Sequence, residues 1–271
     1  MKMTRINKKI GLIGCGNMGI AILSGLIRNH ISQRSQIFVY DSISSKMISA
    51  SRIFGVKKVK SNLDLVNRTD IVILAVKPQD IHPVAREVRN HLRSNQAIIS
   101  ILAGTPIRRL RRFFGARVLI VRAMPNLGAQ VGEAITAVTS SSSSALRLAE
   151  TIFSGCGQVI RLPEKFFDLV TAVSGSGPAY FFLLMELLSK VAVAGGIPEK
   201  SARLLAVQTA LGAGKLAQIS ADSPELLRKK VTSKKGTTEA ALRYLWKRKF
   251  GAIFIQAIRQ AVRRARELSR N

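Results

Sequence analysis

Short apolar runs alternate with helical patterns along the first part of the chain. The runs KIGLIG, QIFVY, DIVILAV, AIISI and RVLIV are rich in Ile and Val and are bounded by turn or polar residues, as buried strands are. Helical periodicity lies between them, at Asn17–His30, Ser45–Phe54 and Ile81–Leu92. AITAV (Ala134–Val138) and QVIRL (Gln158–Leu162) extend the sheet in this interpretation. The alternation predicts an α/β fold, a parallel sheet with helices on both faces.

The strand pattern ends near Pro163, and only helical periodicity follows. The segments that carry it are Phe166–Val173, Ala179–Ala194, Glu199–Ile219, Pro224–Val231, Thr238–Lys247 and Ala252–Ser269. We therefore predict two domains, a Rossmann-type parallel-sheet domain at residues 1–162 and an all-α domain at residues 163–271.

The most apolar stretch of the sequence is Ala179–Ile197, which Glu186 and Lys190 interrupt. A charge near the centre of a membrane helix costs about 2.5–3.5 kcal/mol, so we interpret the stretch as a buried helix of a soluble protein. Apolar residues occupy nearly every face of this helix, and other helices must therefore enclose it. A domain of five or six helices is too small to do so alone, which predicts an oligomer.

The chain is strongly basic, with 43 Lys and Arg against 15 Asp and Glu and a formal charge of +28. Such a charge is typical of nucleic-acid binding, and a polyanion-binding protein on a vestigial Rossmann scaffold is the alternative from a different functional class. The excess is dispersed, however. Its dense runs, RRLRRFF (Arg108–Phe114) and VRRAR (Val262–Arg266), lie on helical patterns without an aromatic stacking ladder or zinc-finger spacing. We favour a solvated basic face, with no nucleic-acid partner.

The two cysteines, Cys15 and Cys156, form neither a metal-ligand spacing nor a disulfide framework. The N-terminal sequence MKMTRINKK runs directly into a short apolar strand and lacks a signal-peptide pattern. We expect a cytoplasmic protein without a metal site or a membrane partner.

The hexapeptide Gly14-Cys15-Gly16-Asn17-Met18-Gly19 follows a predicted strand and opens a predicted helix. In a GxGxxG turn of this kind the first glycine makes the tight turn, the second admits a pyrophosphate, and the third lets helix and strand pack closely. The helix N-terminus supplies free N–H groups and a partial positive charge. The pattern predicts dinucleotide binding, and a glycine-rich turn without a ligand is the alternative.

Other predicted strands end in loops that would lie at the same ligand-binding edge of the sheet. VKPQ (Val76–Gln79) and AMPN (Ala123–Asn126) are two of them. Asp41 ends the second strand, where an acidic side chain accepts from the ribose 2′-OH of NAD or else caps the next helix. Ser42, Ser44, Ser45 and Lys46 follow and could hold a 2′-phosphate instead.

Seven motifs in order then give the chain a family resemblance. They are GCGNMG, AVKPQ, SILAG, RAMPN, AVSGSGPAYFF, QTALGAGK and VTSKKGTTEAAL, and together they resemble pyrroline-5-carboxylate reductase, the last enzyme of proline biosynthesis. The resemblance runs from about Lys9 to Leu268. It implies reduction of 1-pyrroline-5-carboxylate to L-proline with NAD(P)H. It also implies a homodimer formed by interlocking C-terminal helices, and possibly a decamer built from dimers.

The resemblance further implies an active site that joins one subunit's cofactor to a substrate loop of its partner. We expect cofactor contacts at Ile13, Gly14, Cys15, Gly16, Asn17, Met18, Gly19, Asp41, Ser42, Ala75, Val76, Lys77, Pro78, Met124, Pro125 and Asn126.

The substrate loop corresponds to Val231–Thr238. By resemblance, the Ser233 hydroxyl and the amides of Gly236 to Thr238 hold the substrate carboxylate, and the Thr238 hydroxyl reaches the ring nitrogen. Val231, Ser233, Gly236, Thr237 and Thr238 are thus the expected substrate residues, with Ser233 and Thr238 catalytic. The residues themselves agree, because hydroxyls and free N–H groups at a turn that opens a helix suit a carboxylate. Orientation of a protonated imine against a nicotinamide needs no further acid or base pair.

Two departures from the family pattern bear on activity. Lys234-Lys235 stands where the family usually has Pro-Gly, and Leu127-Gly128 stands where it usually has Thr-Pro. The first exchanges a rigid turn for a flexible, cationic one, which aids capture of a carboxylate but weakens positioning. An imino-acid reductase of weakened or altered specificity is the alternative that these departures leave open.

The choice of cofactor rests on conflicting residues. A carboxylate at about 4 Å from a 2′-phosphate opposes it by about 4 kcal/mol per charge pair at an effective dielectric of about 20. The hydroxyls of Ser42 and Ser44, the charge of Lys46 and the overall positive field favour the more anionic cofactor. We expect NADPH, with NADH possible, and we expect Asp41 to turn outward as the cap of the following helix.

Overall fold

The computed structural model describes residues 5–270, which form two compact units. The first unit contains the described residues up to Ser176 together with those from Val262 onward, and the second is Gly177–Ala261. The predicted domain boundary at 162/163 coincides with the end of the last strand, whereas the contacts divide the chain after Ser176. The intervening residues join the first unit because Phe167 and Ala172 are buried. The boundaries 1–162 and 163–271 stay a prediction.

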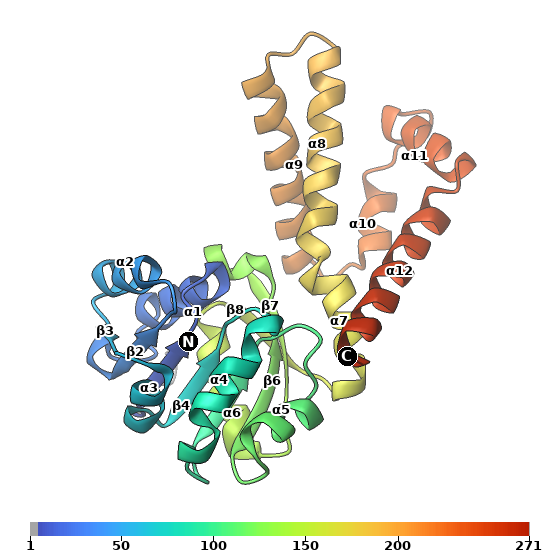
Figure 1. Ribbon diagram of the computed structural model, residues 1–271. Coiled ribbons are helices and arrows are strands. Elements are labelled where there is room, and N and C mark those ends of the chain that lie inside the picture. The colour runs from blue at the N-terminus through green and yellow to red at the C-terminus, as the bar shows by residue number, and fades with distance from the viewer. Residues whose placement is uncertain (1–4, 271) are drawn as a thin grey trace. The chain divides into compact units, whose positions relative to one another are not determined.

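The first unit is built around an eight-stranded sheet of order β3-β2-β1-β4-β5-β6-β7-β8 (Figure 1). The strands are β1 (Ile10–Ile13), β2 (Ile37–Tyr40), β3 (Lys57–Lys58), β4 (Ile71–Leu74), β5 (Ala97–Ser100), β6 (Leu119–Met124), β7 (Ala134–Thr139) and β8 (Gly157–Arg161). The six strands from β3 to β6 are parallel and follow the order of a Rossmann fold. The parallel α/β prediction is confirmed for these strands. AITAV and QVIRL extend the sheet as expected, but β7 pairs antiparallel with β6.

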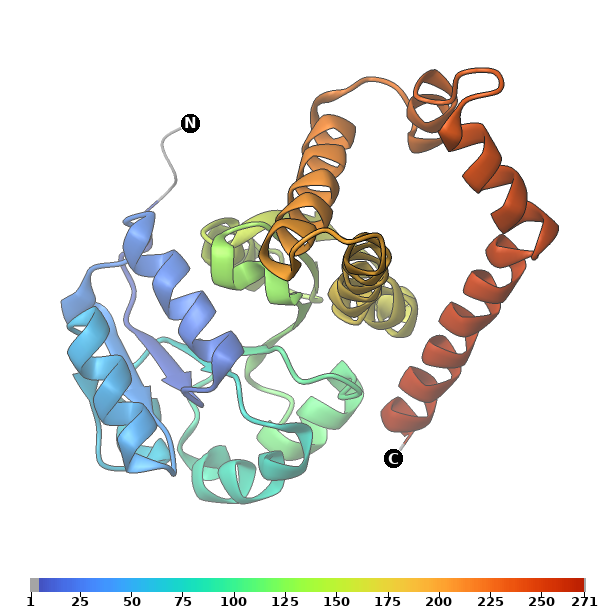
Figure 2. The ribbon, with the colours of Figure 1, turned by 90° about the horizontal axis from the view of Figure 1, so that it is seen from above.

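Two hydrophobic cores cover the two faces of this sheet, and the central strands are therefore buried on both sides. Helices α1 (Asn17–Arg28), α2 (Ser44–Phe54) and α6 (Ser143–Ser154) contribute to one core. Helices α3 (Asn62–Arg68), α4 (Ile81–Val88) and α5 (Ile107–Phe114) contribute to the other. Figure 2 views the same layers from above. The short helix α7 (Phe167–Val170) and a π-helical turn, Thr171–Gly175, follow β8.

The second unit is helical, as predicted. It comprises α8 (Gly177–Ala194), α9 (Glu199–Ile219), α10 (Pro224–Lys230), α11 (Thr237–Lys247) and the first part of α12 (Phe250–Arg270). Helices α8 and α9 lie side by side as a hairpin (Figure 1). The Tyr180 and Phe254 rings of α8 and α12 meet edge to face, with centroids 5.8 Å apart.

Helix α8 is not enclosed within a single chain, as expected for a helix that a domain of this size cannot bury alone. Only Gly177 of this helix is buried, and Val191 is 74% exposed. Phe181, Leu184, Leu188 and Val191 form an exposed stripe at helical spacing along it. By length and composition alone, the continuous helical stretch Glu164–Ala194 could also cross a membrane. A single chain leaves this apolar surface uncovered.

Both cysteines lie in the core of the first unit as free thiols. Burial raises the pKa of Cys15 to about 12, and the nearby Asp41 carboxylate adds to the effect. Burial also raises the pKa of Cys156, to about 11. The native protein therefore keeps both thiols protonated at a pH at which an unfolded chain ionises them.

We predict that these thiols make the protein less stable as the pH rises from 9 to 11. Above the ordinary thiol pKa of 9.0 the unfolded state binds fewer protons than the native state, so the free energy of unfolding falls with pH. Urea unfolding at equal protein concentration measures the slope. A Cys15→Ser/Cys156→Ala variant should lose stability less steeply across this range. Equal slopes for variant and parent would contradict the prediction.

Candidate dinucleotide and substrate sites

The turn from β1 into α1 leaves room for a ligand at one glycine and for no side chain at two others. Gly14 has a φ of +101°, and a Cβ there would lie 2.6 Å from the Ala75 carbonyl oxygen on the neighbouring β4 loop. A Cβ at Gly19 would lie 2.1 Å from the Gly14 carbonyl oxygen. A Cβ at Gly16 would meet nothing within 4 Å. Gly16 therefore faces open space, whereas Gly14 and Gly19 lie in close contact with neighbouring backbone atoms.

The first turn of α1 presents free hydrogen-bond donors beside Gly16. Gly16 is the N-cap residue, and no side chain caps the helix. Within residues 5–270 the backbone N–H groups of Asn17 and Met18 have no acceptor. Unpaired N–H groups and the positive end of the helix dipole favour an anion at this position. The residues Ile13 to Gly19 thus fit the pyrophosphate of a dinucleotide.

Asp41 binds the glycine turn, which corrects the expectation that it turns outward as a helix cap. Its Oδ2 accepts from the backbone N–H of Cys15 at 2.7 Å, and its Oδ1 accepts from that of Ile43 at 2.8 Å. Helix α2 instead has Ile43 as its N-cap, without a side-chain hydrogen bond. The Cys15 N–H has no helical partner, so a carboxylate at the end of the adjacent strand satisfies it.

The residues expected to read the cofactor's ribose surround Asp41 at the start of α2. Ser42, Ser44, Ser45 and Lys46 are all exposed. Lys46 lies near enough to the turn to oppose the effect of Asp41 on the pKa of Cys15, which is raised overall. This corner therefore combines one carboxylate that is engaged by the turn with a cation and several free hydroxyl groups.

The two further loops expected at the cofactor occupy the same edge of the sheet, because they follow the parallel strands β4 and β6. The Ala75 N–H donates to the Ile13 carbonyl at 2.8 Å, which joins the β4 loop to the glycine turn. Beyond it, Val76 is half-buried, Lys77 is exposed and Pro78 opens a 3-10 turn. Pro125 in the β6 loop is buried. All the expected cofactor residues thus lie at the carboxyl edge of the sheet.

Ser174 and Gly175 of the motif AVSGSG contact the loop after β6. Asn126 donates through Nδ2 to the Ser174 hydroxyl at 3.4 Å and accepts through Oδ1 from the Ile135 N–H at 3.3 Å. A Cβ at Gly175 would lie 2.5 Å from Cε of Met124. Sequence reasoning quoted this motif for the family resemblance without assigning Ser174 and Gly175 this supporting role.

The departure at Leu127-Gly128 fits its local structure. The segment Leu127–Val131 forms a 3-10 turn after Asn126. The Gly128 carbonyl accepts from the Glu133 N–H at 2.9 Å, and a Cβ on Gly128 would lie 2.5 Å from the Glu133 carbonyl oxygen. Glycine is thus required by the close return of the chain at this turn.

The expected substrate loop lies in the second unit, between α10 and α11. Val231 is 64% exposed. The Gly236 N–H donates to the Ser233 carbonyl at 3.1 Å and closes a turn in which Lys235 has a φ of +57°. The Lys235 N–H in turn donates to Glu239 Oε2 at 2.6 Å. These bonds hold a compact turn at the N-terminus of α11.

One of the expected carboxylate donors is already used by this turn. The Gly236 amide pairs with Ser233, so it is not free for a ligand as we had expected. The amides of Thr237 and Thr238 have no acceptor within the described residues, and no side chain caps α11. Ser233 Oγ would lie 2.3 Å from a Cβ at Gly236, which places the hydroxyl beside the helix start. Two amides and the Ser233 hydroxyl remain available.

Sequence reasoning missed a partly buried ion pair in the first unit. Arg122 of β6, whose side chain is 5% exposed, donates to Glu164 at 3.1 Å, and its guanidinium lies over the Phe167 ring. Glu164 also accepts from the Ile107 N–H at 2.7 Å. An arginine inside the apolar run RVLIVRAM was the available signal, since a buried charge requires a partner.

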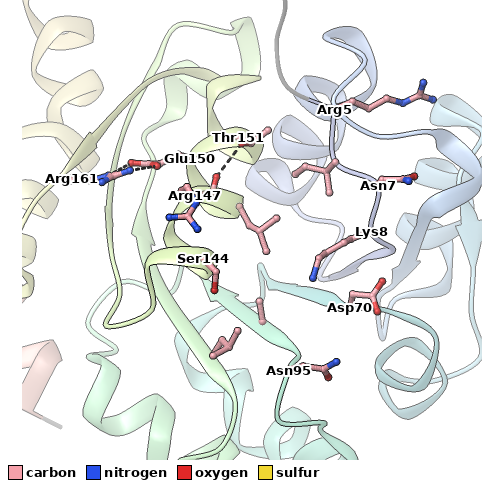
Figure 3. A pocket seen from close by; sticks show the side chains of 14 residues that line it. Arg5, Asn7, Lys8, Asp70, Asn95, Ser144, Arg147, Glu150, Thr151 and Arg161 are labelled. Carbon is pink, nitrogen blue, oxygen red and sulfur yellow. Dashed lines mark hydrogen bonds and ion pairs between the residues drawn. The ribbon is translucent and has the colours of Figure 1, made fainter.

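A cavity in the first unit lies away from these loops. It measures about 700 Å³ and lies where β4, β5 and β6 begin, between Asp70, Ala97 and Leu119 (Figure 3). Arg161 and Glu150 form an ion pair at its rim. Since parallel α/β sheets bind ligands at the opposite, carboxyl edge, this cavity is not the candidate cofactor site.

Two family models match the chain. A model described as "Pyrroline-5-carboxylate reductase dimerisation" matches residues 164–268. A model described as "NADP oxidoreductase coenzyme F420-dependent" matches residues 9–104. The first match covers the helical region and the second covers the glycine turn and the β4 loop.

Named relatives match along the whole chain. Pyrroline-5-carboxylate reductase of Escherichia coli is 35% identical and is covered over 100% of its length by 98% of this chain. That of Methanosarcina acetivorans is 36% identical, over 99% of its length and 97% of this chain. Among solved structures, a pyrroline-5-carboxylate reductase from Coxiella burnetii is 35% identical, with a TM-score of 0.90 and coverage of 97% of this chain and 99% of that one. The NADP-bound Plasmodium falciparum pyrroline carboxylate reductase is 29% identical, with a TM-score of 0.88 and coverage of 98% and 99%. The chain belongs to the pyrroline-5-carboxylate reductase family.

Proposed function

We propose that this enzyme reduces 1-pyrroline-5-carboxylate to L-proline with NADPH, or alternatively NADH, as the last step of proline biosynthesis. The observation that carries the proposal is the glycine turn, open at Gly16 beside the free amides of α1, in a chain that matches these reductases over nearly its full length. The match to an NADP oxidoreductase model and to a reductase solved with NADP supports the nicotinamide cofactor. The polyanion-binding alternative lacks comparable support.

The cofactor is held at the carboxyl edge of the first unit. The amides at the start of α1 bind the pyrophosphate, and Ser42 with Lys46 binds the 2′-phosphate of NADPH. The loops Ala75–Pro78 and Met124–Asn126 border the nicotinamide end. Asp41 keeps the turn in shape, since both of its oxygens accept from backbone N–H groups.

The substrate carboxylate is held by the turn before α11. The Ser233 hydroxyl and the amides of Thr237 and Thr238 donate to it, and Lys234 and Lys235 add positive charge. The Thr238 hydroxyl lies at the ring nitrogen and orients the imine, so that little reorganisation precedes reaction. A bound reduced nicotinamide supplies the hydride for the imine carbon, while the nitrogen carries the proton that makes proline.

We further propose that the helical unit forms a homodimer in the cytoplasm. The match to a dimerisation model over residues 164–268 supports a homo-oligomer. The exposed stripe Phe181, Leu184, Leu188 and Val191 supports it independently, because a contiguous apolar surface of this kind marks an interface. Assembly of dimers into a decamer is part of the same proposal.

The reductase activity is tested by replacing the Thr238 hydroxyl. Wild-type protein should consume NADPH, measured by its absorbance at 340 nm, only when 1-pyrroline-5-carboxylate is added. Thr238→Ala should lower kcat by about a hundredfold, the scale of a group that acts on a transferring proton, and leave the KM for NADPH unchanged. Thr232→Ala is the matched control, since that hydroxyl donates to the Arg228 carbonyl at 2.6 Å. Absence of substrate-dependent oxidation in the wild type would refute the function, and equal losses of kcat and cofactor affinity would refute the role of Thr238.

The role of Asp41 is tested by its effect on the two cofactors. As a support for the turn, Asp41→Ala should raise the KM for NADPH and NADH by a similar factor of about ten, because it removes a charge-assisted hydrogen bond. Lys46→Gln should instead raise the KM for NADPH selectively. Initial rates with each cofactor measure both ratios. A preference for NADPH that increases more than tenfold in Asp41→Ala would show that the carboxylate reads the ribose.

The dimer is tested by placing a charge in the apolar stripe of α8. Leu188→Glu should lower the molar mass measured by light scattering at micromolar concentration, since an unpaired carboxylate cannot be buried in the interface. Lys190→Glu is the matched control on the same helix, where the side chain is 69% exposed. A monomeric wild type, or a Leu188→Glu protein that assembles like wild type, would contradict the proposal.

A further inference from the structure

Three adjoining cavities form a groove on the first unit, along α4, α5 and the end of α12. Their volumes are about 450, 310 and 170 Å³. The first two share Arg108 and Arg270, and the last two share His82 and Arg112. Because neighbouring cavities have walls in common, they make one continuous surface, which we call the basic groove. None of its residues belongs to the expected cofactor or substrate sets.

The basic groove carries a large excess of positive charge. Its basic residues are Arg86, Arg89, Arg108, Arg109, Arg112, Arg122, Lys165, Arg266 and Arg270. Its two carboxylates are already engaged, since Glu164 pairs with Arg122 at 3.1 Å and Asp168 accepts from the Ser269 hydroxyl at 2.7 Å. Within residues 5–270 no carboxylate forms an ion pair with the other eight basic residues. Among the described residues, most of the positive charge of the groove is therefore not paired with a carboxylate.

The arginines at the rim of the groove are both close together and accessible. Arg108 and Arg112 stand four residues apart on α5 and are exposed, so their side chains share one helix face. Beneath them, Arg122 is held by Glu164 and by the Phe167 ring, whose centroid lies 4.8 Å away. The floor is thus held in place while the rim is free to bind.

The chemistry of these residues favours phosphate groups over nucleic-acid bases. Guanidinium groups donate in pairs to phosphate oxygens, and a row of them matches a row of phosphates. A single-stranded nucleic acid would also present bases, which stack on exposed aromatic faces. Phe113 lines the groove, but His82 packs edge-on against it at 4.8 Å and Arg109 lies over it at 5.6 Å. Its ring is already occupied.

We propose that the basic groove is a binding site for a linear oligophosphate of three or more phosphates. Several adjacent arginines contact one oligophosphate at the same time, so its affinity rises with the number of phosphates. Inorganic polyphosphate and the triphosphate of a nucleotide share this chemistry. The proposal does not depend on the reductase activity.

Isothermal titration with inorganic tripolyphosphate tests the site on the full-length protein at about 150 mM salt, where weak surface pairing is screened. Saturating NADP+ is present throughout, so that the dinucleotide site is filled. Tripolyphosphate should bind at least tenfold more tightly than orthophosphate. Arg108→Gln/Arg112→Gln should weaken it by about tenfold or more, with the reductase rate unchanged. ATP and inorganic polyphosphate are titrated under the same conditions. If ATP binds as tightly as tripolyphosphate, the site recognises the triphosphate group. If inorganic polyphosphate binds more tightly, the site recognises a longer phosphate chain.

The matched control removes the same charge elsewhere on the first unit. Arg52→Gln/Arg117→Gln alters two exposed arginines outside the groove, and it should change tripolyphosphate affinity by less than about twofold. Equal weakening by the two double variants would show a general effect of net charge and overturn the proposal. No binding of tripolyphosphate, or tighter binding of a single-stranded oligonucleotide than of tripolyphosphate, would overturn it as well.

Discussion

The structure of the cofactor edge depends on a steric constraint, the closeness of three backbone segments around the β1–α1 turn. Gly14 lies against the Ala75 carbonyl and Gly19 lies against Gly14, with space for no Cβ at either position. These contacts bring the N-terminus of α1 up to the carboxyl edge of the sheet, where the Asn17 and Met18 amides have no acceptor among the described residues and Gly16 borders open space. A side chain at Gly14 or Gly19 would separate helix from strand and move the donors away from a pyrophosphate.

Asp41 adds an electrostatic constraint to the same turn. Its two oxygens each accept from one backbone N–H group, which fixes the carboxylate against the turn while each oxygen keeps one further acceptor site. It also places a negative charge beside the buried Cys15 thiol, whose pKa is raised to about 12. The thiol therefore stays neutral at physiological pH and does not disturb the anion site through its own charge. Support of the turn and tolerance of a phosphate are compatible when Lys46 offsets the carboxylate.

Local pattern predicted most of the first unit, whereas features set by long-range contacts were not predictable. The apolar runs identified the main strands because each is buried on both faces, and Gly14, Gly16 and Gly19 identified the turn. Strand β3, Lys57–Lys58, is two exposed lysines and carries no apolar signal. The antiparallel direction of β7 depends on its pairing with β6. The hydrogen bond of Asp41 to Cys15 joins residues 26 apart in sequence, so helix capping was the simpler local interpretation.

The turn before α11 has a glycine-like backbone conformation at Lys235, a residue with a Cβ. Lys235 adopts a positive φ that favours glycine, which is what the family usually has there, at a cost of about 1–2 kcal/mol for a residue with a Cβ. The conformation is imposed by its neighbours, because the Gly236 N–H binds the Ser233 carbonyl and the Lys235 N–H binds Glu239. Two hydrogen bonds of about 1 kcal/mol each are of the size needed to offset that strain. The bonds of the Gly236 and Lys235 N–H groups thus hold the turn, and the change to Lys-Lys alters mainly its charge.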